Sequence, residues 1–346
     1  MKVLVLSSLR SETGNCSTAR RIRDGLTKCD VECVLAGVHQ FGSCNDLDVF
    51  IKSNQIHCVV GIHAWRAGYL LWDCSVPYCL VLGGTDVNEH YKDSSHMVVM
   101  TTAIKQARCV VAFSKPMFRR AVELWPECEE KTLIQPQAVS VSPSSASFQA
   151  RFKNFCDESN CNCQVQVKVI FLLAGGMRPV KDVTFLMRAI SDWHERDPRI
   201  HLFIIGPELD ERYASQVKLE AEKCHGVVLV PGLPTPEMHA CMRDSFALLN
   251  TSLSEGMATS LLEAMALGVP VLARDIEANS AIIHHRKTGL LFSIPDEFVS
   301  LARELMVSPS LRKELVTHAR KYVEMTHSFN KEKRTYFSII QQMVSL

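Results

Sequence analysis

Two glutamates stand eight residues apart around the start of a predicted helix. Glu255 follows the apolar run at 246–250 after a short loop, and Glu263 falls inside a strongly helical stretch at 258–267 that Gly268 should end. Eight residues of helix rise roughly 12 Å, comparable with the separation between the sugar ring and the ribose of a nucleotide-sugar. Carboxylates accept hydrogen bonds from hydroxyl groups, which both of those rings offer. One acid could therefore hold each end of such a ligand.

The start of the same helix is a candidate phosphate site. Backbone N–H groups near Thr259 and Ser260 would have no partners within the helix, and the helix dipole places partial positive charge there. The alternative is that Glu255 is a helix-start acid favoured by the dipole and that Glu263 is an ordinary surface acid. The order of strand, loop and helix around both acids favours the ligand-binding interpretation.

Two cations follow another apolar run, at 167–173. Arg178 and Lys181 come just after Gly175 and Gly176. Arg can bind two oxygens of an anion at once, and Lys acts as a point charge. Isolated basic residues after a strand are usually exposed surface charges. Their position after a strand and two glycines favours a functional role here.

The elements that must position these residues alternate regularly. Short β-branched runs separated by amphipathic segments are typical of βα units in a parallel sheet. In the first half we expect strands at 2–6, 31–36, 56–62, 78–82, 108–113 and 132–135. In the second half we expect them at 167–173, 201–206, 226–230, 246–250, 269–273 and 290–292. The sequence therefore predicts an α/β protein with two Rossmann-like domains.

The alternation breaks between Val139 and Val165, where a serine-rich stretch precedes a polar one. Such a composition marks a domain boundary, so we expect domains at 1–138 and 167–325 with a linker at 139–166. Ligands of open α/β sheets lie beyond the carboxyl ends of the strands. Two such domains would hold a ligand in the cleft between them.

The composition excludes several classes of protein. Of 346 residues, 47% are hydrophobic and 22% charged, which rules out a collagen-like or largely disordered chain. The 38 Lys and Arg nearly balance the 37 Asp and Glu, and a net charge of +1 provides no general field for nucleic acid or an anionic membrane. No apolar run approaches the roughly 18 residues of a transmembrane helix. The opening strand is too short for a secretory signal.

The cysteines and one sequon bear on location. The 14 cysteines are mostly scattered through apolar segments, which predicts reduced thiols rather than a disulfide framework. Asn250 begins an N-glycosylation sequon, but a glycan five residues from Glu255 could obstruct the proposed site. We therefore expect a cytoplasmic protein, with a secreted or secretory-pathway protein as the alternative.

The segment 255–271, which contains both glutamates, resembles the E-x7-E signature of the group 1, or family 4, glycosyltransferases of the GT-B fold. Further family blocks are similar to residues 175–182, 202–207 and 287–292. The resemblance covers about 167–310 well and the first domain more loosely. It implies two Rossmann-like domains facing across a cleft. It also implies transfer of a sugar, with retained anomeric configuration, from a nucleotide-sugar donor to an acceptor that the sequence does not identify.

The resemblance also implies roles for individual residues. Arg178 and Lys181 would grip the donor diphosphate, Glu263 would bind the ribose hydroxyls, and Glu255 would bind a sugar hydroxyl without attacking the sugar. Basic side chains and the helix start would replace a divalent cation, so we expect no metal and no other cofactor. The chain contains no convincing cluster of metal ligands. As in related proteins, a helix within 326–346 should pack back on the first domain.

The first domain resembles the family in three places. Gly14 would lie near the phosphates and the acceptor, His63 would contact the donor sugar, and Asp86 would orient a hydroxyl group or a neighbouring loop. The alternatives are a plain turn glycine, a structural histidine and an aspartate that satisfies turn amides.

Other functions stay open on the same scaffold. The main alternative is a catalytically inactive relative that binds a nucleotide-sugar or a partner protein. An epimerase or a phosphorylase would keep the fold and change the reaction. An NAD dehydrogenase is disfavoured because no G-x-G-x-x-G follows either opening strand.

Overall fold

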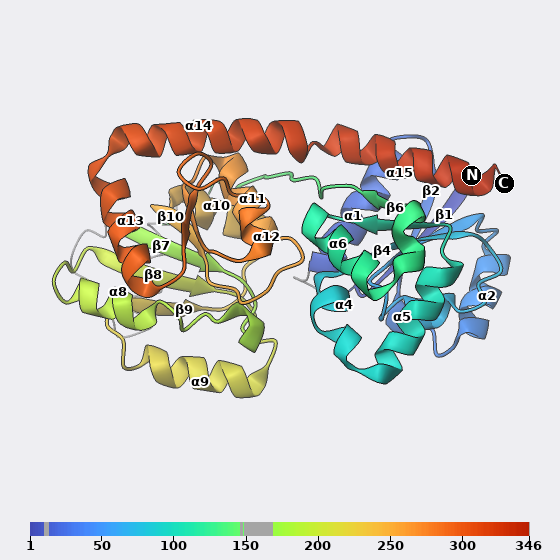
Figure 1. Ribbon diagram of the computed structural model, residues 1–346, viewed down its shortest axis with the longest axis horizontal. Helices are drawn as coiled ribbons and strands as arrows, with labels where there is room; N and C mark the ends of the chain where they lie inside the picture. The colour runs from blue at the N-terminus through green and yellow to red at the C-terminus, as the bar shows by residue number, and fades with distance from the viewer. Residues whose placement is uncertain (10–13, 146–147, 149–168, 346) are drawn as a thin grey trace. The chain divides into compact units, whose positions relative to one another are not determined.

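The computed structural model describes residues 1–9, 14–145, 148 and 169–345. The chain divides into two compact units, each with its own sheet (Figure 1). The first unit comprises Met1–Ala138, Glu255–Met257 and Thr326–Leu346, and the second comprises Val139–Ser254 and Ala258–Met325. Most of the expected linker, including 149–166, lies outside the described residues.

The first unit is built from six strands and the helices between them. Its strands are β1 (Lys2–Ser7), β2 (Glu32–Gly37), β3 (Cys58–Ile62), β4 (Tyr78–Val81), β5 (Cys109–Ala112) and β6 (Thr132–Ile134). Its helices are α1 (Gly14–Thr27), α2 (Cys44–Ser53), α3 (Gly68–Leu71), α4 (Gly84–Asn88), α5 (Ser94–Gln106), α6 (Lys115–Leu124) and α15 (Phe329–Val344). Short 3-10 turns are η1 (Val38–Gln40), η2 (His90–Lys92) and η3 (Pro126–Lys131).

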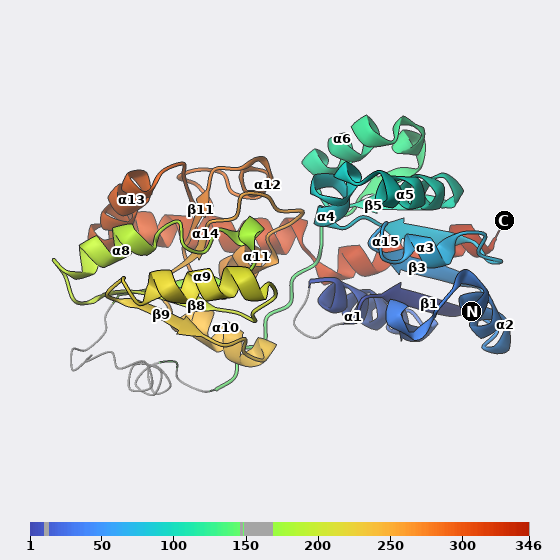
Figure 2. The same ribbon diagram turned by 90° about the horizontal axis from the view of Figure 1, so that it is seen from below.

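The second unit repeats the alternation. Its strands are β7 (Val169–Ala174), β8 (Ile200–Ile205), β9 (Val227–Val230), β10 (Ala247–Asn250), β11 (Val271–Arg274) and β12 (Leu290–Phe292). Its helical segments are η4 (Pro179–Lys181), α8 (Met187–His194), α9 (Glu211–Ala221), α10 (Thr235–Asp244), α11 (Thr259–Leu267), α12 (Glu277–Ser280), α13 (Pro295–Val307) and α14 (Pro309–Thr326). Helices α8 and α9 cover one face of this sheet, and α10 and α11 cover the other (Figure 1). Figure 2 shows α9 running beside β8 and β9.

Both sheets are parallel, and both reverse their strand order. The first sheet has the order β2-β1-β3-β4-β5-β6, and the second has the order β12-β11-β10-β7-β8-β9. The prediction of two Rossmann-like α/β halves is therefore confirmed. In doubly wound sheets the loops after the two strands at the reversal diverge to opposite faces and leave room for a ligand. Those loops follow β1 and β3 in the first sheet and β7 and β10 in the second.

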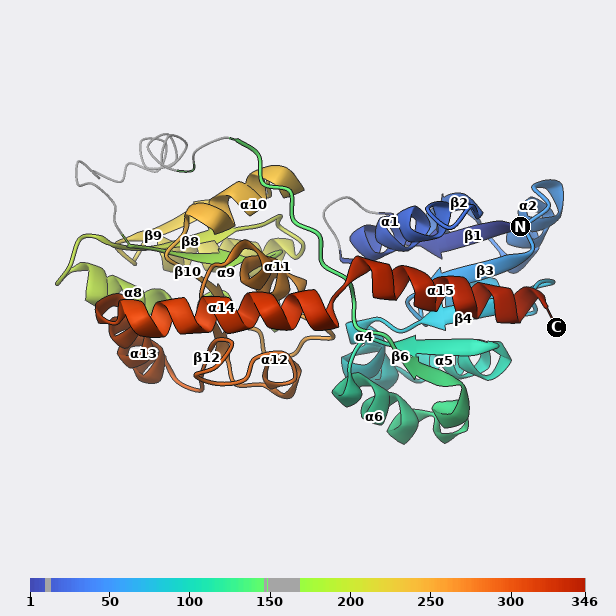
Figure 3. The same cartoon turned by 90° about the horizontal axis from the view of Figure 1, so that it is seen from above.

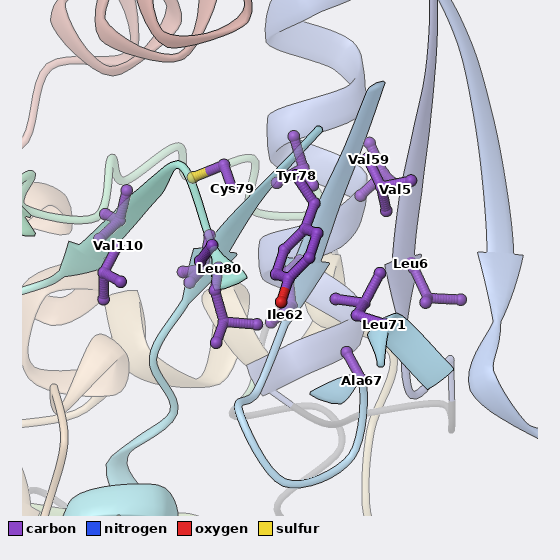
Figure 4. Close-up of a cluster of buried hydrophobic side chains, with 14 of the residues drawn as sticks. Val5, Leu6, Val59, Ile62, Ala67, Leu71, Tyr78, Cys79, Leu80 and Val110 are labelled. Carbon is purple, nitrogen blue, oxygen red and sulfur yellow. The ribbon is translucent and has the colours of Figure 1, made fainter. Parts of the chain in front are cut away.

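The strands form because their side chains are apolar on both faces, as expected when helices cover a parallel sheet on each side. Val5, Val59 and Leu80 come from three neighbouring strands and are fully buried together (Figure 4). The Tyr78 hydroxyl donates to the carbonyl of Ala103 at 2.6 Å, so this buried polar group has a partner. In the second unit the ring of Phe171 packs edge-on against several aromatic rings at the centre of the core.

Helix α15 docks against α1 and the strands β3 and β4 of the first unit (Figure 3). Its Glu332 is 2% exposed and accepts two hydrogen bonds from the Arg21 guanidinium, at 2.8 and 3.2 Å. The same carboxylate accepts from the Ala138 N–H at 3.1 Å. Removing either charged partner would leave a buried charge uncompensated, so this pair fixes the helix in place.

Two further observations bear on the sequence-based expectations. No helix in the described ranges has both the length and the apolar character required to cross a bilayer. Within the same ranges no two cysteines form a disulfide.

The buried histidine of β8 predicts a pH dependence of stability. His201 is 1% exposed, and burial lowers its pKa from the usual 6.5 to about 4. Below about pH 6.5 His201 of the unfolded chain is protonated, whereas His201 of the folded chain stays neutral down to about pH 4. The free energy of unfolding should therefore fall across this window, by at most about 1.4 kcal/mol per pH unit from this residue.

Urea unfolding of the wild type and of His201→Leu at several pH values between 7.5 and 4.5 tests this expectation. The substitution should remove the contribution of His201, so the stability of the variant should fall less steeply with acidification. Parallel curves would contradict the assignment, whatever the difference in absolute stability.

Candidate functional site

At the reversal point of the second sheet, the loop after β7 is hydrogen-bonded to the loop after β10. Arg178 precedes the turn η4, and Lys181 ends it. The Thr251 hydroxyl donates to the carbonyl of Lys181 at 2.9 Å, and the Leu253 N–H donates to the carbonyl of Val180 at 2.9 Å. The turn that carries both predicted phosphate-binding cations is thus tied to the segment that leads towards α11.

An ion pair braces this turn. Asp182 has a φ of 43°, in the left-handed region, which aspartate tolerates better than most residues. Its Oδ2 lies 2.7 Å from Nη1 of Arg274, at the end of β11. The Arg274 guanidinium also covers the ring of Phe185, 4.1 Å from its centroid. The conformation of η4 is therefore also held from β11, the second strand along the sheet from β7.

The Arg178 side chain carries a buried donor. Its Nε atom is inaccessible to solvent and has no hydrogen-bond partner among the residues that the structure describes. A buried guanidinium N–H normally has an acceptor, and an anion is the acceptor that guanidinium binds best. This donor therefore suits the phosphate role predicted for Arg178.

The backbone close to this turn is tightly packed. A Cβ atom on Gly206, just after β8, would collide with the carbonyl of Gly175. The N–H of Gly175 donates to the carbonyl of Ile205 at 3.0 Å, so the two chain segments cannot separate without losing a hydrogen bond. Glycine at position 206 allows the loop that carries Arg178 to begin at this point.

Helix α11 supplies the expected helix start. It begins at Thr259, no side chain caps it, and its first internal bonds run from the N–H groups of Leu261 and Leu262 to the carbonyl of Ala258. The N–H groups of Thr259 and Ser260 thus stand at the start of the helix, before its internal bonds begin. Their binding of an anion stays a prediction. Gly268 ends the helix with a φ of 77°, which confirms the predicted terminator.

The two predicted glutamates do not share one helix. Residues 255–258 precede α11, so only part of the interval to Glu263 is helical, and the helical rise of roughly 12 Å does not describe their separation. Glu255 belongs to the first unit, whereas Glu263 belongs to the second. Glu263 lies one turn inside α11 with its side chain 27% exposed, so a ligand can reach it.

A histidine that the sequence analysis missed lies beside Glu263. His239 is 2% exposed on α10, which packs against α11 (Figure 3). Its Nε2 atom lies 3.9 Å from Oε2 of Glu263, and its Nδ1 atom accepts a hydrogen bond from the Ser142 N–H at 3.1 Å. These partners are distant in sequence, so no local spacing could have identified the residue.

Asn250, at the end of β10, is 5% exposed. Its Oδ1 atom accepts hydrogen bonds from the Ser252 N–H at 3.2 Å and from Nδ2 of Asn279 at 3.0 Å. A glycan is attached through Nδ2 of asparagine, and at this degree of burial the folded chain leaves little room for one on Asn250. The predicted sequon is therefore part of the structural support of the site.

In the first unit, His63 and Asp86 come together after neighbouring strands. Nδ1 of His63 lies 2.7 Å from Oδ1 of Asp86, which is fully buried and accepts from the N–H groups of Ala64, Trp65 and Gly83 at 2.7 to 3.0 Å. Burial opposes the ionisation of Asp86, but His63 and these N–H groups outweigh it and lower the pKa of Asp86. The turn expected at Asp86 is the short helix α4. The Asp86 carboxylate accepts from the N–H of Gly83, the residue just before this helix, and so stabilises its start.

The backbone of His63 is strained, and both nitrogens of its ring have a polar partner. Its φ of 80° lies in the left-handed region, which is uncommon for a residue other than glycine and concentrates at functional sites. Its Nε2 atom lies 2.6 Å from the Thr85 hydroxyl. Asp86 and Thr85 together set the orientation of the ring.

Further aromatic side chains surround His63. The ring of His90 packs edge-on against that of His63, and Trp65 stacks on His96 with centroids 3.8 Å apart. Burial, followed by the charge of His63, lowers the pKa of His90 to about 4, so His90 is neutral near pH 7. No three acidic, histidine or cysteine side chains of the described chain are arranged to hold a metal ion. The cluster is therefore suited to hydrogen bonding and stacking.

Gly14 is the first residue of α1. The loop between it and β1, at 10–13, lies outside the described residues. Apart from its chain neighbours, no described residue has an atom within 4 Å of the position that a Cβ atom on Gly14 would take. Its predicted proximity to phosphate stays a prediction.

The chain is similar to known glycosyltransferases over nearly its whole length. Residues 164–322 match the family model described as glycosyl transferases group 1. The chain is 39% identical over 340 residues to glycosyltransferase 1 domain-containing protein 1 of Xenopus tropicalis, covering 98% of this chain and 97% of that protein. It is 19% identical over 248 residues to the putative glycosyltransferase YtcC of Bacillus subtilis (strain 168), covering 68% of this chain and 60% of the relative.

Solved structures share the fold. Anabaena HepE in complex with UDP and glucose has a TM-score of 0.79 at 13% identity, over 99% of this chain and 100% of that one. Sucrose-phosphate synthase from Thermosynechococcus elongatus has a TM-score of 0.78 at 13% identity, over 100% and 99% of the two chains. These neighbours establish the GT-B fold. Because the 39% identity extends over nearly the whole chain, this protein belongs to the group 1 glycosyl transferases and is a glycosyltransferase.

Proposed function

We propose that the protein is a retaining glycosyltransferase that takes a sugar from a nucleotide-sugar donor, and that the donor nucleotide binds to the second unit. The observation that carries this proposal is the hydrogen-bonded pair of loops after β7 and β10. It brings the turn that holds Arg178 and Lys181 to the reversal point of the sheet. Ligands of this sheet class bind at that point.

The donor diphosphate would be held by positive groups of three kinds. Arg178 offers a guanidinium with a buried donor, Lys181 offers an ammonium group, and α11 offers the open N–H groups of Thr259 and Ser260. As the bond to the sugar breaks, charge builds on the diphosphate, and fixed positive groups stabilise that state more than the ground state. These groups would do the work of a divalent cation, so we propose catalysis without a metal or another cofactor.

The hydroxyl-bearing rings would be bound by acids and by His63. Glu263 would accept from the ribose hydroxyls and Glu255 from a sugar hydroxyl, which positions the anomeric carbon. His63, oriented by Asp86, would contact the donor sugar. None of these groups acts as a nucleophile in this proposal, and the product keeps the anomeric configuration of the donor.

Uridine diphosphate is the first nucleotide to test. The HepE structures contain UDP with glucose, and UDP-glucose. The similarity in fold does not fix the base, so GDP and its sugars are the second set. The acceptor is to be sought with whichever donor binds.

We further propose that the protein works in the cytoplasm. The burial of the Asn250 side chain supports this proposal, because the folded protein leaves little room for a glycan at its sequon.

Substitution of Arg178 should weaken nucleotide binding. Arg178→Ala should raise the Kd for UDP or GDP about 10- to 100-fold, since a hydrogen bond to a charged group contributes about 1.5–3 kcal/mol. Isothermal titration calorimetry measures the change. Arg188→Ala is the matched control, because Arg188 is an 83% exposed arginine of the same unit that pairs with Asp192. Equal affinities of the two variants would argue against a diphosphate site at Arg178.

Substitution of Glu255 should separate binding from chemistry. Glu255→Gln should lower the rate of donor turnover about 100-fold, because the sugar loses its positioning contact. The Kd for free UDP or GDP should change less than about threefold, because neither ligand carries the transferred sugar that Glu255 is proposed to bind. Release of the nucleoside diphosphate from a UDP-sugar or GDP-sugar is the readout. A wild-type protein that binds the donor without turning it over would support the inactive alternative.

Chelation should leave turnover unchanged. Because side chains and the start of α11 neutralise the diphosphate in this proposal, EDTA at a few millimolar should not lower the rate, and added Mg²⁺ or Mn²⁺ should not raise it more than about twofold. Loss of activity on chelation, with recovery on adding one of these ions, would contradict the metal-free proposal.

A further inference from the structure

His239 is buried against the acid that is proposed to bind the ribose, and sequence motifs assign it no role. Its side chain is 3% exposed, between α10 and α11. The nearby carboxylate of Glu263 is 27% exposed and can meet both the histidine and a ligand. Both residues lie in the second unit.

The Ser142 N–H determines which nitrogen of His239 carries the proton. A backbone N–H can only donate, so Nδ1 of His239, 3.1 Å away, must accept. A neutral imidazole then has its proton on Nε2. Ser142 is itself held along α10, because the Ser144 N–H donates to the carbonyl of Pro236 at 2.8 Å and Arg243 donates to the carbonyl of Ser144 at 3.2 Å.

The Nε2–H group of His239 is a buried donor that requires an acceptor. Nε2 is shielded from solvent and has no hydrogen-bond partner among the described residues. Oε2 of Glu263 lies 3.9 Å away, about 1 Å beyond an ordinary N–H···O bond. A buried donor without an acceptor is unfavourable, so a small movement of the Glu263 side chain towards the histidine would be stabilising.

We propose that His239 is a positioning residue for Glu263. Its Nε2 proton holds Oε2 of the carboxylate and leaves Oε1 to accept from the ribose hydroxyls. A carboxylate has enough lone pairs for both sets of donors, and a fixed carboxylate loses less rotational freedom when the ligand binds. The inference rests on the proposed function, in which Glu263 binds the ribose. It adds a second residue that sharpens the preference for ribose over deoxyribose.

Two conservative variants separate the two nitrogens of His239. In His239→Gln the amide nitrogen replaces Nε2 and can still donate to Glu263, but the acceptor for Ser142 is lost. In His239→Asn the amide oxygen replaces Nδ1 and can still accept from Ser142, but the donor to Glu263 is lost. If His239 acted only through its bond to Ser142, His239→Asn should behave like the wild type. If His239 positions Glu263, His239→Gln should behave like the wild type.

The readout is the ratio of Kd values for the 2′-deoxy and the ordinary nucleoside diphosphate, measured by calorimetry with UDP and dUDP or with GDP and dGDP. We expect the wild type to prefer the ribose form about tenfold, His239→Gln to keep that preference, and His239→Asn to reduce it below about twofold. Glu263→Gln should also abolish it. Retention of the preference by His239→Asn, or its loss in His239→Gln alone, overturns the inference.

A measurement on the wild type covers the case in which a substitution disturbs folding. Nitrogen-15 NMR should place the proton of His239 on Nε2. The resonance of this Nε2–H proton should shift downfield when UDP or GDP binds, because the hydrogen bond to Glu263 shortens. A proton on Nδ1, or no shift at saturation, overturns the inference. If the wild type binds neither nucleotide, the proposed function fails, and the inference fails together with it. If Glu263→Gln weakens binding while His239→Asn does not, only the inference fails.

Discussion

The proposed donor site depends on one set of contacts, the hydrogen bonds and the ion pair that join the loop after β7 to its neighbours. The carbonyls of Val180 and Lys181 are held from the loop after β10, and Asp182 is held by Arg274 from β11. Two flexible cations would otherwise lose much conformational freedom on binding a diphosphate. Because the turn is fixed before any ligand arrives, its charges can act as a preorganised electrostatic site.

The two units carry different chemical groups on similar parallel sheets. Both sheets reverse their strand order. In the second unit the candidate residues follow β7 and β10, the strands at the reversal. In the first unit Gly14 and His63 follow β1 and β3 at the reversal, and Asp86 follows the next strand, β4. The second unit places cations and an open helix start there, which suits an anion. The first unit places a strained histidine after β3, and a buried aspartate and an aromatic cluster that contains the neutral His90 after β4. Such groups offer oriented hydrogen bonds and flat surfaces, which suit the hydroxyl groups and ring of a sugar.

The sequence predicted the fold well because a parallel sheet covered on both faces requires continuous apolar strands, which are recognisable without a structure. It also predicted the helix at α11 and its glycine terminator. It misjudged the interval from Glu255 to Glu263, because a rise per residue applies only where the chain is helical. It missed His239, and it missed the bracing of Asp182 by Arg274, because these partners are brought together only by packing between elements. The fold and the start of α11 were therefore accessible from local pattern, whereas the proximity of His239 to Glu263 and the pairing of Asp182 with Arg274 required the structure.

The most direct test of the central claim is a crystal structure of the protein with UDP or GDP, whichever binds. The account predicts that the diphosphate oxygens lie within hydrogen-bond distance of Arg178, Lys181 and the first N–H groups of α11, with the ribose hydroxyls on Glu263. A nucleotide bound elsewhere on the chain, with Arg178 and Lys181 turned towards solvent, would contradict it.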